Sequence, residues 1–485
     1  MAVAEQAPAN LRAVGLSDVL YLPKDEAYDA SIASYWSLTA QLRPWAIVQP
    51  RNTEEVAKAV GALVDAPDVK FAVRSGGHMS WAGASNIVDG ITIDLGLMKG
   101  TSYNPETQIA SLLPGGTWAK VYTELGKYGR MVAGGREGTV GFGGLLTGGG
   151  KTFYTCRVGF ACDQVVNYEV VLANGRIVNA NSKTNPDLFR VLKGGGNNFG
   201  IVTRLYMVTF PAGDIWDCSL ACPKESTAEV AQALVDFTDS LTAHPNDHVL
   251  AMWTYMPKTK DHFILMLMMN LDAEEEPHTL RKFLSIPGQK DSKVITVATK
   301  LESFFVPSGK QDTWLSLTFK SDLRIILKAA SVFEALITTL KTQIPDENFY
   351  FSMALQPLPA SFGKHSAVRG GNMLGLDRIT DDCVLLVWAI EVETPKLNTG
   401  VGSPALKSAI DEISAYAASV NGDIGFRYLN YCDGSQDPVG SYGEENVRKM
   451  REAAAKYDPT GVFQTRVPGG FKISNVGSRS YYPGR

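Results

Sequence analysis

The sequence predicts an α+β protein with two domains. The chain has 485 residues, more than one hydrophobic core usually supports. Dense glycine clusters occur only before Pro211, whereas the stretch that follows alternates amphipathic helices with apolar strands. That alternation is typical of helices packed on an antiparallel sheet. We therefore expect a glycine-rich domain over 1–212 and an α/β domain built on an antiparallel sheet over 213–424.

The glycine-rich part should open with a strand, a helix and a second strand. A short apolar run at 46–48 ends before Pro50, and Thr53 is a good N-cap followed by two glutamates. Valines and leucines at helical spacing continue to residue 64. The apolar stretch 70–77 then runs into a glycine turn, which completes a strand–helix–strand unit.

Later elements follow from periodicity and turn residues. Asn174-Gly175, in the middle of the apolar segment 165–180, is a strong hairpin signal. The expected strands lie within 87–100, 107–116, 193–211, 248–257, 262–271 and 382–393. The expected helices lie within 117–129, 226–244, 323–344 and 444–463, the last stopped near Asp458-Pro459.

Composition excludes several classes of function. The formal net charge of −4 shows no excess of Lys and Arg of the kind that indicates nucleic-acid binding. The longest apolar run, 263–269, is far shorter than the roughly 20 residues that span a bilayer. Cys218 and Cys222 have no second Cys/His pair, so we expect no metal site, and the six cysteines form no disulfide framework. With no signal peptide at its start, the chain should be intracellular and cytoplasmic.

The glycine clusters indicate a ligand held close to the main chain. Turns rich in glycine present backbone N–H groups to anions and let flat or phosphorylated ligands touch the backbone. Gly141 and Gly143 begin a dinucleotide fingerprint but lack its third glycine, and the spacing before Lys151 does not fit a P-loop. A nucleotide is therefore expected, bound in a way that differs from both of these folds.

Four motifs, spread over nearly the whole chain, resemble one family. They are "RPWAIVQPRNTEEV" at 43–56, "RSGGH" at 74–78, "GTVGFGGLLTGGG" at 138–150, and "RYLNYCDGSQDP" at 427–438 with "YDPTGVF" at 457–463. In this order they resemble the berberine-bridge-enzyme-like branch of the vanillyl-alcohol oxidase / p-cresol methylhydroxylase superfamily, in its fungal form. The resemblance implies a PCMH-type FAD-binding fold, with segment 425–485 returning to the FAD domain.

The same resemblance assigns the cofactor and its contacts. His78 matches the histidine that bonds to the 8α-methyl carbon of the flavin, and neutral imidazole is a suitable nucleophile. Many relatives carry a cysteine that bonds flavin C6 where this chain has Glu137, so we expect a single covalent link. The implied FAD contacts are Arg74, Ser75, Gly76, Gly77, His78, Met79, Ser80, Gly138, Thr139, Val140, Gly141, Gly143, Gly144, Thr147, Gly148, Gly149, Ile201, Val202, Asn430 and Tyr431.

The resemblance also suggests the reaction. Val140 matches a gate over flavin C4a, where a small residue goes with oxygen reactivity. We expect a FAD-dependent oxidase that acts on an alcohol, an amine or an oxidative ring closure in a small secondary metabolite or carbohydrate and reduces O2 to H2O2. Either Tyr428 or Glu391 would be the catalytic base. A cyclase with a structural flavin and a dehydrogenase using another acceptor remain the alternatives.

Overall fold

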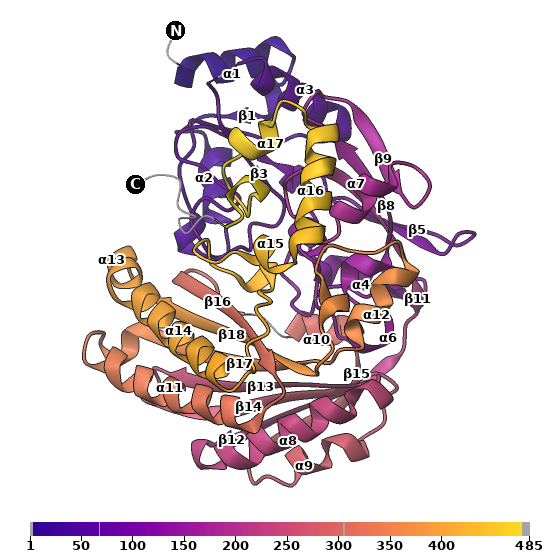
Figure 1. Cartoon of the computed structure of the whole chain (residues 1–485). Coiled ribbons are helices and arrows are strands. Elements are labelled where there is room, and N and C mark those ends of the chain that lie inside the picture. Colours follow the sequence, from indigo (N-terminus) through magenta and orange to yellow (C-terminus); the bar gives the residue numbers. More distant parts are fainter. Residues whose placement is uncertain (1–2, 67, 304–305, 478–485) are drawn as a thin grey trace.

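The computed structural model describes residues 3–66, 68–303 and 306–477 (Figure 1). The described chain forms two halves. One half contains the N-terminal and C-terminal segments, and the other contains a large sheet with its helices (Figure 1). The α+β class expected from the sequence is confirmed.

The first sheet has the strand order β1-β2-β4-β3, in which β2, β4 and β3 run parallel and β1 is antiparallel. Its strands are β1 (Leu20–Tyr21), β2 (Ala46–Val48), β3 (Phe71–Arg74) and β4 (Ile91–Asp94). The accompanying helices are α1 (Val3–Ala13), α2 (Glu26–Ala33) and α3 (Thr53–Val64). The expected strand–helix–strand unit is therefore confirmed, although the side chain that caps α3 is Asn52, one residue before the predicted Thr53.

The second sheet is antiparallel, in the order β5-β6-β10-β8-β9. Its strands are β5 (Thr101–Asn104), β6 (Ile109–Leu112), β8 (Val165–Val171), β9 (Ile177–Asn181) and β10 (Ile201–Val208). The hairpin predicted at Asn174-Gly175 joins β8 to β9, and Gly175 has a φ of 76°. Beside this sheet lie α4 (Trp118–Gly126), α5 (Phe142–Thr147), α6 (Thr155–Val158), α7 (Pro186–Val191) and the pair β7 (Arg130–Met131) and β11 (Phe210–Pro211).

The other half is built on a seven-stranded antiparallel sheet in the order β15-β12-β14-β13-β17-β18-β16. Its strands are β12 (Asp214–Pro223), β13 (Asp247–Met256), β14 (Asp261–Asn270), β15 (Gln289–Thr296), β16 (Gln311–Lys320), β17 (Phe349–Leu358) and β18 (Cys383–Val392). The antiparallel sheet expected after Pro211 is thus confirmed. The predicted boundary at 212 falls between β11 and β12, which belong to different sheets.

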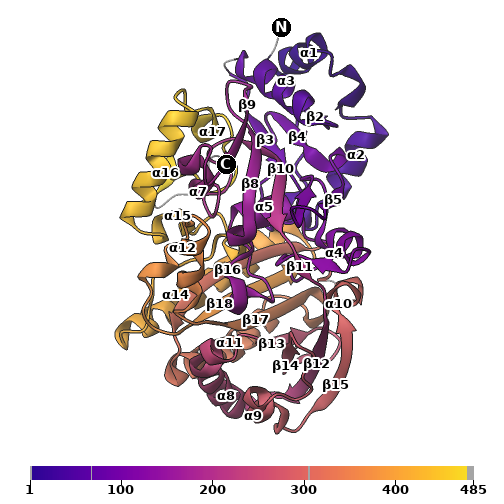
Figure 2. The ribbon, with the colours of Figure 1, turned by 90° about the vertical axis from the view of Figure 1, so that its right-hand side faces the viewer.

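Helices cover one face of this sheet, and the other face turns toward the first half (Figures 1 and 2). The covering helices are α8 (Thr227–Ser240), α9 (Arg281–Leu284), α11 (Leu323–Lys341) and α14 (Ser403–Ser419). The shorter helices are α10 (Val297–Ser303), α12 (Phe362–Val368) and α13 (Pro395–Leu397). Apolar side chains on one side of α8 and α11 are buried, as their sequence periodicity predicts.

The C-terminal segment lies on the first half of the molecule (Figure 1). It forms α15 (Pro438–Ser441), α16 (Glu444–Tyr457) and α17 (Val462–Thr465). The Phe463 ring meets the Phe71 ring at 6.4 Å between centroids, and Arg466 Nε donates to the Val69 carbonyl at 2.9 Å. The chain therefore leaves the first half at β11 and returns to it after the large sheet.

The six cysteines all lie in the described part of the chain and are unpaired thiols. Among the residues that the structure describes, no helix has the length and apolar composition needed to cross a membrane.

Candidate active site

A cavity of about 830 Å³ lies between the two halves of the molecule. It is lined by Ile201, Phe463 and Gly470, by the loop after β3 and by the glycines around α5. Residues of the large sheet also line it. Both halves of the molecule therefore contribute side chains to one cavity.

His78 follows β3 and lines the cavity. Its ring stacks on Trp36, with 4.7 Å between centroids and 12° between planes. Nε2 lies 3.3 Å from Thr139 Oγ1, and the Thr139 hydroxyl donates its hydrogen to Glu137 Oε2 at 2.8 Å. The Thr139 oxygen can therefore accept a hydrogen from His78 Nε2, and in that tautomer Nδ1 carries the lone pair. Burial lowers the pKa of His78, although Glu137 opposes this shift, so the ring is neutral near pH 7.

Glu137 is a buried carboxylate in the same wall of the cavity. Its Oε2 accepts from the backbone N–H groups of Thr139 at 2.7 Å and Val140 at 2.9 Å, and lies 3.7 Å from His78 Nε2. Its Oε1 has no hydrogen-bond partner within the described residues. The carboxylate thus fixes one side of the loop around His78 and keeps one buried oxygen available to a ligand.

Several of the predicted glycines are required by contacts between two loops. A Cβ on Gly141 would lie 2.6 Å from the Gly76 Cα, and one on Gly143 would lie 2.6 Å from Ser75 Oγ. The loop after β3 and the start of α5 are therefore in direct backbone contact. Gly144 differs, because it lines the cavity and a Cβ there would meet no atom within 4 Å. Packing between the two loops therefore does not require a glycine at position 144, and the open side of Gly144 faces the cavity.

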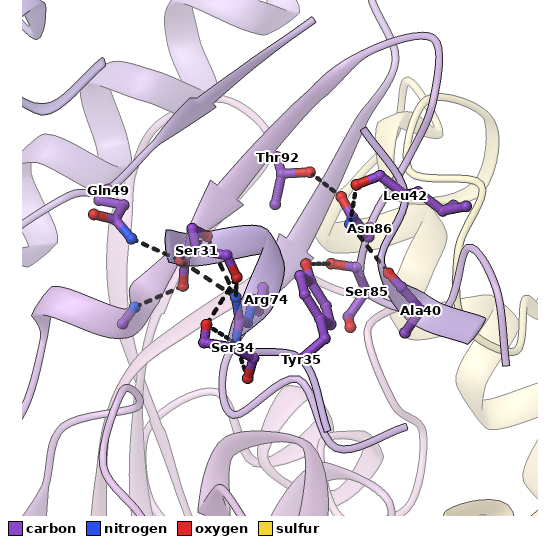
Figure 3. A network of polar contacts seen from close by, with 12 residues as sticks. Ser31, Ser34, Tyr35, Ala40, Leu42, Gln49, Arg74, Ser85, Asn86 and Thr92 are labelled. Carbon is purple, nitrogen blue, oxygen red and sulfur yellow. Dashed lines mark hydrogen bonds and ion pairs between the residues drawn. The ribbon is translucent and has the colours of Figure 1, made fainter. Parts of the chain in front are cut away.

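Arg74 does not line the cavity, although the sequence placed it among the cofactor contacts. Its guanidinium lies below the loop, where Nη1 donates to the Ser31 carbonyl at 2.7 Å and Nη2 to the Ser34 carbonyl at 2.9 Å (Figure 3). It also stacks over the Tyr35 ring, 3.9 Å from the centroid, and its Nε would lie 2.7 Å from a Cβ on Gly77. Arg74 therefore supports the glycine turn from beneath.

The other predicted cofactor contacts divide between the cavity wall and the layer behind it. Those that line the cavity are Ser75, Gly76, Gly77, His78, Met79, Ser80, Val140, Gly141, Gly143, Gly144, Thr147, Ile201, Val202, Asn430 and Tyr431. Those behind it are Gly138, Thr139, Gly148 and Gly149. Gly148, for example, packs on Asn430, whose Oδ1 would lie 1.9 Å from a Cβ at that position.

Tyr428, one of the two candidate bases, is buried and its oxygen is fully engaged. The hydroxyl oxygen accepts from the backbone N–H groups of Gly150 at 2.9 Å and Lys151 at 2.7 Å, and from Asn430 Nδ2 at 3.0 Å. Burial raises the pKa of Tyr428, and the Tyr431 ring beside it acts in the same direction. The three donors act in the opposite direction and lower the pKa, because they stabilise the phenolate. They also hold the end of the glycine run in place.

Glu391, the other candidate base, lines the cavity from the end of β18, the strand next to the edge strand β16 of the large sheet. Its neighbours in register are Asp312 on β16 and Tyr350 on β17. Burial raises the pKa of Glu391 to about 7. Burial, with the charge of Glu391 acting in the same direction, raises the pKa of Asp312 to about 8. The two carboxyl groups can therefore hold at least one proton near neutral pH.

Comparison with known proteins identifies the family. Residues 44–181 match the model of an FAD binding domain. The FAD-dependent monooxygenase drtC of Aspergillus calidoustus is 38% identical over 97% of this chain and 91% of its own length. The chain belongs to the berberine-bridge-enzyme-like family of FAD-linked oxidoreductases. The bifunctional solanapyrone synthase of Alternaria solani is 30% identical over 96% of this chain and 88% of its own length.

Solved structures support the fold of this FAD-linked oxidoreductase. The BBE-like 1 protein of Physcomitrella patens has a TM-score of 0.76 at 19% identity, covering 99% of this chain and 100% of the other. The glucooligosaccharide oxidase of Acremonium strictum, described as carrying a 6-S-cysteinyl, 8α-N1-histidyl FAD, has a TM-score of 0.77 at 19% identity, covering 97% and 99%. The PCMH-type fold expected from the sequence is thus confirmed.

The cavity fits FAD on observations within this structure. Within the described residues, the backbone N–H groups of 76–80 donate to no protein acceptor, although they border the cavity. These N–H groups are therefore free to donate to a ligand, and a phosphate would satisfy them. The unpartnered Glu137 Oε1 and the open side of Gly144 lie along the same wall. The FAD-linked oxidoreductase therefore has a preformed cradle for the cofactor.

Sequence reasoning did not find several residues of the site. Trp36, which stacks on His78, comes from the loop after α2, and nothing in its local sequence marks it. Arg136 lines the cavity beside Glu137 and reaches Gln356 on the large sheet. Asp312 is paired with Glu391 only through the register of β16 and β18. The sole available signal was the position of Arg136 just before the third motif.

Proposed function

We propose that this FAD-linked oxidoreductase is an oxidase, which removes two electrons from a small organic substrate and reduces O2 to H2O2. The observation that carries the proposal is that one cavity has the His78–Glu137 loop on one wall and the Glu391 carboxyl on the other. When bound, FAD supplies an acceptor for the two electrons and passes them to oxygen. A secondary metabolite or a carbohydrate is the proposed substrate.

His78 is proposed to hold the flavin by a single covalent bond through Nδ1. The Thr139–Glu137 contacts support this assignment, because they leave the Nδ1 lone pair available. Glu137 stands where many relatives have the second linking residue, and a carboxylate cannot form that thioether. The backbone N–H groups of 76–80 and the cavity wall around Gly144 are proposed to bind the rest of the cofactor.

Glu391 is proposed as the catalytic base. It lines the cavity, and its pKa of about 7 allows it to accept an O–H or N–H proton of the substrate near neutral pH. Asp312 is proposed to position Glu391 and to interact with it electrostatically across the two neighbouring strands. Tyr428 is proposed as a positioning residue for the glycine run, because three donors already occupy its oxygen.

The acceptor can be tested without knowing the substrate. The holoenzyme is photoreduced under nitrogen and mixed with air-saturated buffer, while flavin absorbance and peroxide are followed. An oxidase should reoxidise within seconds and release one H2O2 per flavin. Val140→Leu should slow this step by roughly tenfold or more, because Val140 lines the cavity and a larger side chain narrows the access. Equal, slow reoxidation in both proteins would indicate a dehydrogenase.

A second candidate, a monooxygenase, is favoured by the name of the drtC relative. It would insert one atom of O2 into the product, whereas an oxidase inserts none. Turnover under labelled oxygen, once a substrate is found, separates the two. A cyclase with a structural flavin would leave the flavin oxidised when substrate is added without air.

We also propose an intracellular, cytoplasmic location, which the unpaired thiols support.

A further inference from the structure

Arg136 lies in the cavity wall beside the large sheet. The side chains that contact its guanidinium are all neutral. Its Nη2 donates to Gln356 Oε1 at 2.7 Å and to Tyr431 Oη at 2.7 Å. Its Nη1 lies 3.4 Å from His248 Nε2. Within the described residues, Arg136 forms no ion pair with a carboxylate. The neighbouring Glu137 directs its bonded oxygen to Thr139 and Val140 instead.

Two more nitrogen bases lie close to this guanidinium in the cavity wall. Lys151 is buried, and its Nζ donates to the Pro357 carbonyl at 2.6 Å. Burial and the charge of Arg136 lower the pKa of both Lys151 and His248 well below their ordinary values. Of the carboxylates that line the cavity, Asp217 is paired with Lys300, and Glu137 accepts from the backbone of Thr139 and Val140. Among the described residues Arg136 therefore has no carboxylate bound directly to it.

An unbalanced cation in a partly dehydrated wall is unfavourable, and an anionic ligand removes that cost. Both Nη2 hydrogens of Arg136 are donated to Gln356 and Tyr431, so the guanidinium can offer an anion its charge and single hydrogen bonds from Nη1 or Nε. The sheet wall beside it is apolar, with Leu250, Met252, Leu265 and Met269 turned into the cavity. The geometry therefore combines one anion-binding point with a large apolar surface.

We propose that Arg136, backed by Lys151 and His248, binds an anionic oxygen of the substrate, as a carboxylate, enolate or phenolate carried on an apolar body. This rests on the proposed function, since it names the class of molecule that the same cavity oxidises. It places the acidic group of the substrate at Arg136 and directs the remainder along the sheet toward Glu391. An uncharged sugar would leave the guanidinium without an anion and would not match the apolar wall.

The test compares an acid with its neutral isostere on the holoenzyme. The probes are 2-naphthoate and 2-naphthamide, and binding is followed by the flavin difference spectrum and by tryptophan fluorescence, because Trp314 also lines the cavity. We expect naphthoate to bind at least about tenfold more tightly than naphthamide. Arg136→Gln should weaken naphthoate by about tenfold and leave naphthamide unchanged, and Arg136→Lys should recover part of the difference.

Arg130→Gln is the matched control, because Arg130 contacts Thr209 and Gln108 in the first half and does not line the cavity. Equal binding of acid and amide, or an Arg136→Gln variant that binds the acid like the wild type, overturns the proposal. An Arg136→Gln variant that shifts the flavin midpoint potential but keeps the preference for the acid also overturns the proposal. That result would mean that Arg136 tunes the flavin and does not bind the substrate. A protein without flavin would instead contradict the proposed function, and tryptophan fluorescence would still report the acid preference.

Discussion

At the scale of single residues, the contacts of His78 favour one tautomer of its ring. Thr139 gives its hydroxyl hydrogen to Glu137, and its oxygen can accept a hydrogen from His78 Nε2. The order of these hydrogen bonds depends on the carboxylate, which can only accept. A neutral side chain at position 137 would allow the threonine hydroxyl to turn, and His78 could then adopt the other tautomer.

Glu137→Gln should therefore slow covalent attachment of FAD. Apoprotein is mixed with FAD, and the flavin retained in the acid-precipitated protein is measured over time. We expect attachment to slow by about tenfold or more, since positioned proton acceptors contribute at least that much, while reversible FAD binding persists. His78→Ala should retain no flavin after acid. Glu124→Gln, at a glutamate on α4 paired with Lys127, is the control and should attach flavin like the wild type.

Asp312 provides a test of the buried carboxyl pair by pH. Its folded pKa is about 8, whereas an unfolded aspartate titrates near 4. Between these values the folded state binds more protons, so this residue costs stability increasingly as pH rises from about 4 to 8. Asp312→Asn should therefore raise the melting temperature, by several degrees (roughly 2–4 °C per kcal/mol) at pH 8 and by less at pH 5.

Differential scanning fluorimetry from pH 5 to pH 8 measures this gain, and the exposed Asp291→Asn on β15 is the matched control. A gain that is constant with pH, or a loss that grows toward pH 8, would contradict the protonated state of the pair.

At this scale the sequence predicts only part of the site. His78 and the glycines could be predicted because they form a compact motif. Trp36, Arg136 and Asp312 could not, because their partners are distant in the chain.

At the scale of elements, the two glycine loops are held together by backbone contact. A Cβ on Gly141 would lie 2.6 Å from the Gly76 Cα and 2.7 Å from its nitrogen, and neither backbone can yield easily. Gly141→Ala should destabilise the protein by about 1–3 kcal/mol in urea unfolding. Gly61→Ala in α3, where a Cβ meets no atom within 4 Å, should be neutral or stabilising by up to about 1 kcal/mol. Similar effects of the two variants would refute the loop contact.

Gly144 separates packing from cofactor binding within the same run. It lies in α5 and borders only the cavity, so Gly144→Ala should leave the apoprotein as stable as the wild type. The new methyl group would project into the space proposed for FAD, and FAD affinity should fall by about tenfold. Isothermal titration of apoprotein with FAD measures this. A variant that binds FAD normally would place the cofactor elsewhere.

Elements with strong local signals were predictable, and α5 was not. The strand–helix–strand unit at 46–74 and the hairpin at Asn174-Gly175 follow from capping residues and turn residues. Helix α5 contains two glycines, which have low helix propensity. Burial of Phe142 and Leu146 stabilises it instead, and that packing depends on residues far along the chain.

At the scale of the whole molecule, the site exists because two halves meet. The first half supplies the loop around His78, and the large sheet supplies Glu391 and the apolar wall. The C-terminal segment crosses back to bring Asn430 and Tyr431 to the same cavity. The change in glycine content near residue 212 predicted two parts, but how they face each other depends on contacts that no local pattern reveals.

The mass of two tryptic peptides tests the central claim most directly. Cleavage after Arg74 and Lys99 isolates 75–99 with His78, and cleavage after Arg136 and Lys151 isolates 137–151 with Glu137. We predict that peptide 75–99 from the purified holoprotein carries the mass of FAD less two hydrogens, and that peptide 137–151 has its unmodified mass. An unmodified peptide 75–99 from yellow protein, or a flavin on peptide 137–151, would contradict the single link at His78.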